Sequence, residues 1–258
     1  MNKLLFLLIA SFFFFVSCSS DDSNNLVLLR KCIEPSDWAG QADIETNFIY
    51  TQNKIVSINS GSYKTVFTYV GDLITRMDYY NADKLYSTIN YKYLNGKLVS
   101  DFVDNLRLLS NDFIVEYVYN VDGTISFAEY KIYTDGSKGK FAENEGKILL
   151  SNGNFVEMSL QYGNATPTIL KFQYDANLSP FINVLGFKAI FLSHLTRSAS
   201  NLFTQPISEN NVIRRNENSG FYTGEITAEF IYDKNGFPST KKRFIDGKFV
   251  GVSQYFYE

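Results

Sequence analysis

Side chains that could carry out nucleophilic or metal chemistry are scarce in this sequence. It has two cysteines, Cys18 and Cys32, and one histidine, His194, among 258 residues. A nucleophilic thiolate or serine needs a neighbouring base, usually a histidine, and a transition-metal site needs several His, Cys or carboxylate ligands. We therefore expect no catalytic residue, cofactor or metal site, and we interpret Cys32 as a buried structural thiol and His194 as a partly buried polar residue.

A pair of glutamates offers an enzymatic alternative. If Asp122 and Gly123 form a two-residue hairpin loop, Glu116 lies directly opposite Glu129, with about 5 Å between their Cβ atoms. Two carboxyl groups so placed could act as acid and nucleophile on a glycosidic bond. Like charges face to face also repel, and a four-residue loop instead places Glu116 opposite Phe127. A carboxylate-based glycan hydrolase is therefore the minor hypothesis, and we expect a protein that is not an enzyme.

The start of the chain resembles an export and anchoring signal. Lys3 precedes an apolar run from Leu4 to Val16. The run has the length of a secretory signal and is shorter than the roughly 20 apolar residues that a spanning helix needs. The stretch Val16-Ser17-Cys18 resembles a bacterial lipobox, in which the cysteine thiol is acylated and becomes the first residue after cleavage. The resemblance implies a signal peptide over residues 1–17 and lipid attachment at Cys18.

The residues after Cys18 indicate a cellular location and a flexible tether. Ser19 in this place is similar to lipoproteins that pass to an outer membrane, and the stretch SSDD resembles the surface-export tag of Bacteroidota lipoproteins. Residues 18–25 are polar, acidic and free of large side chains, which predicts a flexible tether. We expect a single domain over residues 26–258, lipid-anchored to the outer membrane and facing the cell exterior.

The charge balance excludes one class of partner. Without residues 1–17 the chain carries 23 basic and 27 acidic residues, and its one small basic cluster is Lys241-Lys242-Arg243. Nucleic-acid binding relies on clustered Lys and Arg, so no nucleic-acid partner is expected. With Cys18 acylated, Cys32 has no disulfide partner, and stability must come from packing and strand pairing.

The body of the chain has the pattern of half-buried strands. In FVEMSLQY, Val156, Met158 and Leu160 alternate with polar residues at period two. Six Asn-Gly or Asp-Gly pairs separate such runs and supply the positive φ of tight hairpin turns. The Asp175–Ser179 stretch is interpreted as another acidic turn, without the ligand density of a calcium loop. The pattern favours an antiparallel meander.

The hairpins also repeat. Alternating residues lead into a Tyr, a short polar turn ending in Gly, and a residue that restarts the strand. The anchor tyrosines are Tyr69, Tyr93, Tyr119, Tyr174 and Tyr232. Their spacing of 24, 26, 55 and 58 residues indicates a unit of about 25 residues with intervening copies interrupted. Repeats of one unit bury their apolar face by stacking on neighbours.

The run from NKIVSI through TYVGDLITRMDYY and NYKYLNGKLVS to FIYDKNGFPSTK resembles a family. It looks like Bacteroidota surface lipoproteins of unknown function whose repeats are similar to the YD repeats of RHS-type proteins. The resemblance implies a mostly β protein attached to the outer membrane. Together with the repeats it predicts an all-β fold, an antiparallel meander of hairpins forming an extended or curled, half-barrel-like sheet.

One segment interrupts the strand pattern. After Pro180, the apolar residues Val184, Phe187, Phe191 and Leu195 recur at spacings that fit one face of a short helix near residues 181–197. We expect it to cover an end or a face of the sheet, and a mobile lid or partner-docking helix is the alternative.

These observations favour a non-enzymatic binding or assembly module at the cell surface. An aromatic-rich sheet could bind a protein or a glycan, although Tyr and Phe are also favoured strand formers. The single Trp, Trp38, lies outside the repeats. A passive structural spacer of the envelope is a further alternative.

Overall fold

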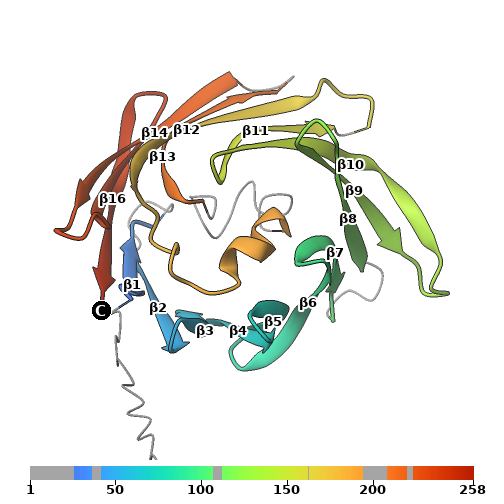
Figure 1. Ribbon diagram of the computed structural model, residues 1–258, viewed down its shortest axis with the longest axis horizontal. Helices are drawn as coiled ribbons and strands as arrows, with labels where there is room; N and C mark the ends of the chain where they lie inside the picture. Colours follow the sequence, from blue (N-terminus) through green and yellow to red (C-terminus); the bar gives the residue numbers. More distant parts are fainter. Residues whose placement is uncertain (1–25, 37–41, 107–111, 162, 194–207, 220–222) are drawn as a thin grey trace, which may run out of the picture.

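The chain folds into a closed antiparallel β-barrel in this computed structural model, which describes residues 26–36, 42–106, 112–161, 163–193, 208–219 and 223–258 (Figure 1). The first eight strands are β1 (Leu29–Glu34), β2 (Ile44–Thr51), β3 (Lys54–Ser60), β4 (Tyr63–Val70), β5 (Leu73–Asn81), β6 (Lys84–Leu94), β7 (Lys97–Asp104) and β8 (Phe113–Tyr119). The next eight are β9 (Thr124–Ile132), β10 (Lys138–Ser151), β11 (Asn154–Gln161), β12 (Thr168–Leu178), β13 (Asn210–Asn218), β14 (Thr223–Tyr232), β15 (Pro238–Ile245) and β16 (Lys248–Tyr257). Each strand pairs with its neighbours in sequence.

The first and last strands close the ring. In β1 and β16, Leu29 lies opposite Tyr257, and Cys32 lies opposite Tyr255. Beyond them, Leu28 and Glu258 exchange two backbone hydrogen bonds, of 2.9 and 3.1 Å. The prediction of an all-β antiparallel meander is confirmed, and the expected extended or curled, half-barrel-like sheet is less precise than the closed barrel. Closure pairs both edges, so no free strand edge is left on the wall.

Four of the repeated tyrosines share one structural role. Tyr69, Tyr93, Tyr119 and Tyr232 lie at or next to the end of the first strand of a hairpin with their side chains on the inner face, whereas Tyr174 lies within β12. The hydroxyl of Tyr93 donates to the Ile74 carbonyl at 2.7 Å, and that of Tyr119 to the Leu98 carbonyl at 3.2 Å, so each ties one hairpin to the preceding one. Burial raises the pKa of Tyr69 to about 12, because the charged phenolate is poorly solvated inside the barrel.

The irregular spacing of the tyrosines also has a structural cause. The hairpin β10–β11 follows Tyr119 and has no tyrosine at the corresponding place, where Leu150 pairs with Phe155. The longer connection between β12 and β13 lengthens the gap from Tyr174 to Tyr232. Two further tyrosines, Tyr50 and Tyr257, also end strands on the inner face; the repeat pattern did not single them out.

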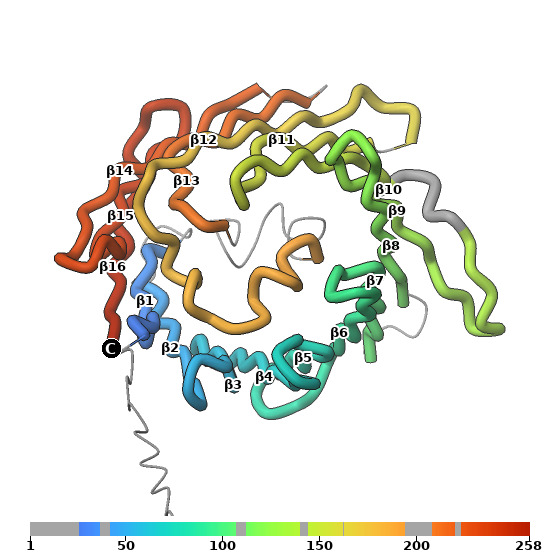
Figure 2. Tube along the Cα trace, in the orientation of Figure 1, coloured from blue at the N-terminus to red at the C-terminus, as the bar shows by residue number. Residues whose placement is uncertain are grey.

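The connection between β12 and β13 enters the barrel. Its residues 179–193, here called the plug, run inside the ring of strands (Figures 1 and 2). They contain the 3-10 helix η1 (Phe187–Ile190). The predicted short helical segment is therefore present, and Val184, Phe187 and Phe191 are buried as its pattern indicated. Leu195 and His194 lie outside the described residues.

The plug packs at one end of the barrel. The Phe187 ring, fully buried, lies 5.8 Å from that of Phe67 and 5.2 Å from that of Phe181. The Leu185 amide donates to the Asn53 carbonyl at 2.9 Å, and its carbonyl accepts from the Tyr69 hydroxyl at 3.0 Å. Asn53 lies in the β2–β3 turn, so the hairpins that follow even-numbered strands surround the plug. We call this the plug end and the other the open end.

Gly186 shows how tightly the plug meets the wall. Its φ is +76°, and a Cβ there would lie 2.8 Å from the Asp72 carbonyl oxygen. We expect Gly186→Ala to lower the free energy of unfolding by about 2 kcal/mol, through left-handed backbone strain and this contact. Gly71→Ala is the control, because its φ is +59° but nothing lies within 4 Å. Urea unfolding should show the larger loss for Gly186→Ala; equal losses would mean that the Asp72 contact costs nothing.

Candidate functional site

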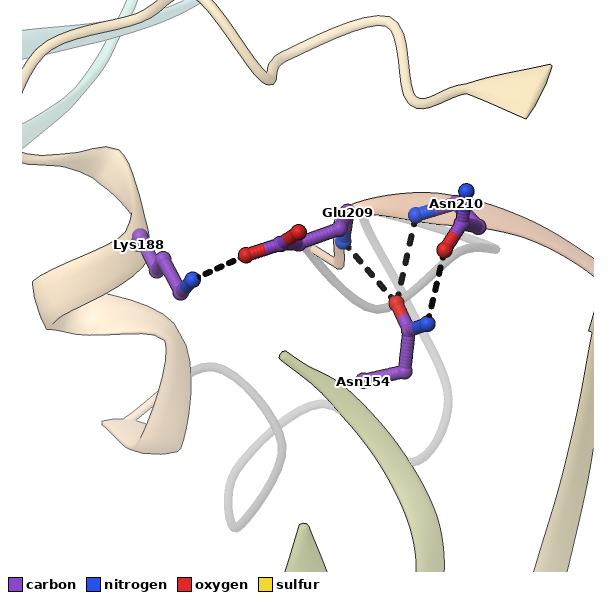
Figure 3. A network of polar contacts seen from close by, with 4 residues as sticks. All are labelled: Asn154, Lys188, Glu209 and Asn210. Carbon is purple, nitrogen blue, oxygen red and sulfur yellow. Dashed lines mark hydrogen bonds and ion pairs between the residues drawn. The ribbon is translucent and has the colours of Figure 1, made fainter. Parts of the chain in front are cut away.

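A network of amide side chains anchors the second end of the plug connection (Figure 3). The side-chain oxygen of Asn154, at the start of β11, accepts from the backbone amides of Glu209 at 3.0 Å and Asn210 at 3.2 Å. Its side-chain nitrogen donates to the Asn210 side chain at 2.8 Å. Glu209 in turn forms an ion pair with Lys188 on η1. The plug is thereby fixed to β11 and β13.

A second network surrounds Asp175 on β12. Its carboxylate accepts from the backbone amides of Asn177 at 3.0 Å and Asn211 at 3.2 Å, and from the Tyr232 hydroxyl. The Asn211 side chain is fully buried and donates to the Leu178 carbonyl at 3.1 Å. The interpretation of Asp175–Ser179 as a turn is wrong, because the stretch lies within β12 up to Leu178. This cluster holds the strand ends from which the plug connection leaves.

Charged side chains also line the inner face toward the open end. On β13, Arg215 pairs with Phe172 and Glu217 with Leu170, which are both buried core residues, so both charged side chains face inward. The guanidinium of Arg215 lies 3.4 Å from the Glu217 carboxylate, and each side chain keeps 28% exposure. A partly solvated ion pair therefore lies inside the wall.

A related cluster lies on β1, β15 and β16. Lys241 is 3% exposed and pairs with Ser253, while Cys32 pairs with Tyr255. Burial lowers the pKa of Lys241, and the nearby Glu34 charge opposes this shift. Burial also raises the pKa of the Cys32 thiol, which makes it a poor nucleophile. The expectation that Cys32 is a buried thiol without a disulfide is confirmed.

Alternation on β15 splits the basic cluster of the sequence. Lys241 and Arg243 pair with inward residues of β14, while Lys242 pairs with Glu229 on the outer face. Arg215, Glu217, Glu34, Lys241 and Arg243 form a group here called the charged lining, and all of them except the buried Lys241 are half-buried and can offer charge-assisted hydrogen bonds to a polar ligand. Sequence reasoning noted the cluster but could not assign its members to a face, because that requires knowing which face is enclosed.

The two glutamates of the hydrolase hypothesis are not brought together. Glu116 lies opposite Ala128, and Glu129 lies opposite Val115, so the two carboxylates point to opposite faces of the wall. Both loop lengths considered from the sequence give the wrong register, because Tyr119 pairs with Ile125. Glu116 forms an outer-face ion pair with Lys138 at 2.6 Å. A catalytic pair of these residues is excluded by geometry.

Glu129 instead predicts a pH effect on stability. Burial raises its native pKa, so the folded state holds its proton more tightly than the unfolded state. The contribution of Glu129 is most favourable below the ordinary glutamate pKa of about 4.3 and is lost as pH rises through the native pKa. We expect Glu129→Gln to be more stable than the native protein at pH 7 by a few tenths of a kcal/mol, because solvent screens a half-exposed group.

Thermal unfolding between pH 4 and pH 7 would check this effect. The advantage of Glu129→Gln should vanish toward pH 4, where the native side chain is protonated. Glu116→Gln is the matched control, since it changes an exposed side chain on the same hairpin. A pH-independent difference for Glu129→Gln would show that the burial of the charged form is not its cause.

The outer face of the wall carries many charged side chains, alongside exposed apolar ones such as Ile231, Phe249 and Phe256. Partners in a ladder share a face, and the core residues Phe67 and Ile148 define the inner one. The outward positions include Lys31, Glu45, Lys64, Arg76, Asp78, Lys92, Asp104, Glu116, Lys147, Glu157, Lys171, Arg214, Glu225, Glu229 and Lys242. Several form outer-face ion pairs, such as Arg76–Asp78 at 2.8 Å and Arg214–Glu225 at 3.3 Å. A membrane-spanning barrel has the opposite pattern, with an apolar outer band about 25 Å tall.

Two searches of the described residues complete the site. No group of three or more His, Cys, Asp or Glu in this part of the chain could hold a metal ion. Among the helices described, none is long and apolar enough to cross a membrane. Cys18 and Trp38 lie outside the described residues, as do the proposed signal peptide and tether.

Comparison with solved structures finds a barrel of similar design. The chain is similar to the crystal structure of a porin-like protein from Bacteroides uniformis, with a TM-score of 0.50 and 9% sequence identity. The match covers 88% of this chain and 96% of the other. The likeness is one of fold. In sequence comparisons no protein-family model and no curated protein matches this chain.

Proposed function

We propose that this chain is a lipid-anchored barrel of the outer membrane, facing the cell exterior, that acts as a non-enzymatic binding or assembly module. The observation that carries the proposal is the charge on the outer wall: side chains such as Lys64, Lys147 and Arg214 face outward, while the apolar core and the plug lie inside. Lipid tails cannot solvate such an outer face, since each Lys or Arg there costs about 2–4 kcal/mol at the bilayer midplane. The barrel therefore stands beside the bilayer, and Cys18 supplies the attachment.

The positions of the two ends of the described chain support an orientation in which the plug end of the barrel faces the membrane. Leu28 and Glu258 are paired at the plug end. An anchor that precedes Leu26 holds the plug end toward the membrane and leaves the open end toward the surroundings. The charged lining then faces the side from which a protein or glycan approaches. The description porin-like applies to the similar protein, and the charged side chains of the outer wall argue against a membrane-spanning pore here.

Fractionation of native protein and Cys18→Ser tests the proposal. Native protein is expected in the outer membrane, with a Cys18-containing peptide that carries acyl chains in mass spectrometry. The Cys18→Ser protein is expected to be recovered without detergent, because its outer wall carries many charged side chains. A Cys18→Ser protein that stays in membranes through carbonate washing would mean a spanning barrel, and an unmodified Cys18 in native protein would remove the anchor.

The binding role has a separate test. Arg215→Ala and Arg243→Ala together remove two cations of the charged lining. A glycan array and a cell-surface pull-down with the native protein should capture a ligand, and the double variant should bind it at least tenfold more weakly. The double variant Lys171→Ala and Arg214→Ala, on the outer face, is the control. Capture of nothing by native protein would favour the passive spacer.

A further inference from the structure

Aliphatic side chains protrude from consecutive turns at the plug end. The hairpins β4–β5, β6–β7, β8–β9 and β10–β11 are neighbours in the wall. Five exposed aliphatic residues, here called the aliphatic rim, lie in or beside these turns: Val121 in a turn, and Val70, Leu94, Leu149 and Leu150 near strand ends. Val70 is 69% exposed, Leu94 63% and Val121 fully exposed at its turn tip. Strands β4 to β11 make up half of the ring, so the rim follows half of its circumference.

The described turns at the open end also lie beside exposed apolar residues, among them Tyr63, Ile245 and Phe249. The β3–β4 turn is Ser-Gly-Ser at residues 60–62, the β5–β6 turn is Asn-Ala-Asp at residues 81–83, and the β15–β16 turn contains Asp246 and Gly247. These turns present small or polar side chains to solvent, as turn chemistry favours. Exposed apolar residues therefore flank turns at both ends, and the position of the chain's start distinguishes the plug end.

The position of the chain's start identifies what faces this rim. The described chain begins at Leu26, and Leu28 pairs with Glu258 at the plug end. Eight residues, 18–25, separate Cys18 from the rest, and a fully extended chain of that length spans about 28 Å at most. An acylated Cys18 thus holds the plug end within about one barrel height of the lipid surface.

Charges beside the rim agree with a lipid surface. Lys92, Lys97 and Lys147 are exposed next to the rim, and Lys97 lies over the Tyr119 ring at 4.8 Å. Of the two acids at the same turns, Asp72 is paired with Lys54 at 3.4 Å. The other, Asp122, accepts from the Thr124 hydroxyl at 2.6 Å. Exposed aliphatic residues flanked by lysines are the features that bind a surface protein to the headgroup and acyl boundary.

We infer that the aliphatic rim docks on the lipid bilayer that holds the anchor, so that the plug end sits on the membrane. The inference rests on the proposed lipid anchor at Cys18. The rim supplies a second attachment and fixes the orientation of the barrel. The open end with the charged lining is thereby held pointing away from the lipid.

Spin-label accessibility in the acylated full-length chain tests this inference. Leu94→Cys and Val121→Cys place labels on the rim, and Ser62→Cys places a control label at the open end; Cys32 is buried and does not compete. The proteins are reconstituted in vesicles of phosphatidylethanolamine and phosphatidylglycerol. Labels at 94 and 121 should collide more often with oxygen than with a water-soluble nickel complex, and the label at 62 less often. Equal behaviour at all three positions would overturn the inference.

A second experiment separates the rim from the anchor. In the Cys18→Ser chain, the triple change Val70→Ser, Leu94→Ser and Val121→Ser should reduce binding to the same vesicles at least tenfold. Thermal unfolding should be unchanged, since these side chains are exposed. No loss of binding would refute rim docking.

The outcomes at Cys18 separate the rim from the anchor. If mass spectrometry finds Cys18 acylated while the rim labels are exposed to water, rim docking is refuted and the anchor stands. If Cys18 is unmodified, the anchor is refuted. Rim labels that are shielded without vesicles, in a dimer seen by sedimentation, would assign the rim to a second copy and overturn the inference.

Discussion

Phe187→Ala is expected to lower the free energy of unfolding by about 3–5 kcal/mol, the usual cost of removing a fully buried aromatic ring. Phe187 has no exposed surface, and its ring contacts those of Phe67 on β4 and Phe181 in the plug. The strand is part of a closed wall, and hydrogen bonds from the Leu185 amide to the Asn53 carbonyl and from the Tyr69 hydroxyl to the Leu185 carbonyl fix the plug. Neither side can collapse freely into the cavity, which places the cost at the upper end of its range.

Urea unfolding with a thermal melt measures this effect. For a chain of this size the melting temperature should fall by roughly 10 °C. Phe249→Ala on β16 is the matched control, because Phe249 is 60% exposed on the outer face and should change stability by less than about 1 kcal/mol. A similar small effect at Phe187 would mean that the plug does not pack inside the barrel in solution.

Asp175→Ala is expected to destabilise the protein by about 3 kcal/mol or more. The substitution removes the acceptor for the backbone amides of Asn177 and Asn211 and for the Tyr232 hydroxyl. Each buried donor left without a partner costs about 1–3 kcal/mol. Asn211 is fully buried, so water cannot replace the lost carboxylate there.

Asp122→Ala serves as the control for this carboxylate. Asp122 also accepts a backbone amide, that of Thr124 at 3.0 Å, but in an exposed turn where water can substitute. Its loss should cost less than about 1 kcal/mol. Asp175→Asn keeps one acceptor oxygen and should recover part of the stability. A cost at Asp175 no larger than at Asp122 would contradict the buried network as the anchor of the plug connection.

The two predictions concern one unit, since Asp175 fixes the strand ends from which the plug connection leaves and Phe187 fills the lumen. A plug without anchors would expose apolar side chains of η1. The wall alone would then enclose an unfilled space at the plug end, and such a space loses packing contacts on every side. Stability of the barrel is therefore tied to the plug as well as to strand pairing.

Local sequence features predicted the strands and the repeat. Alternation in FVEMSLQY places Met158 and Leu160 in the core, and the Tyr-turn-Gly pattern locates the β4–β5, β6–β7 and β14–β15 hairpins. These features depend on residues that are near neighbours along the chain. The helical pattern of Val184 and Phe187 likewise predicted a short helical segment, although it was expected to cover an end or a face of the sheet.

The register between paired strands was harder to predict from the sequence than the strands themselves. The β8–β9 hairpin pairs Tyr119 with Ile125, and this spacing moves Glu116 to the face opposite Glu129. A change of one residue in loop length reverses every side chain of a strand. Turn residues alone therefore do not determine which carboxylates of a hairpin lie opposite each other.

The sequence by itself determined an antiparallel β protein with tyrosine-anchored hairpins, an interrupting helical segment and a lipobox-like start, because each depends on residue types at short spacings. Only the tertiary structure decided that β1 pairs with β16, that the plug lies inside, and that Lys241 and Arg215 face inward while Lys171 and Arg214 face outward. The alternation of apolar and polar residues indicates only that a strand has two different faces. Which face is enclosed depends on how sixteen strands close, and that is settled by contacts between residues far apart in the chain.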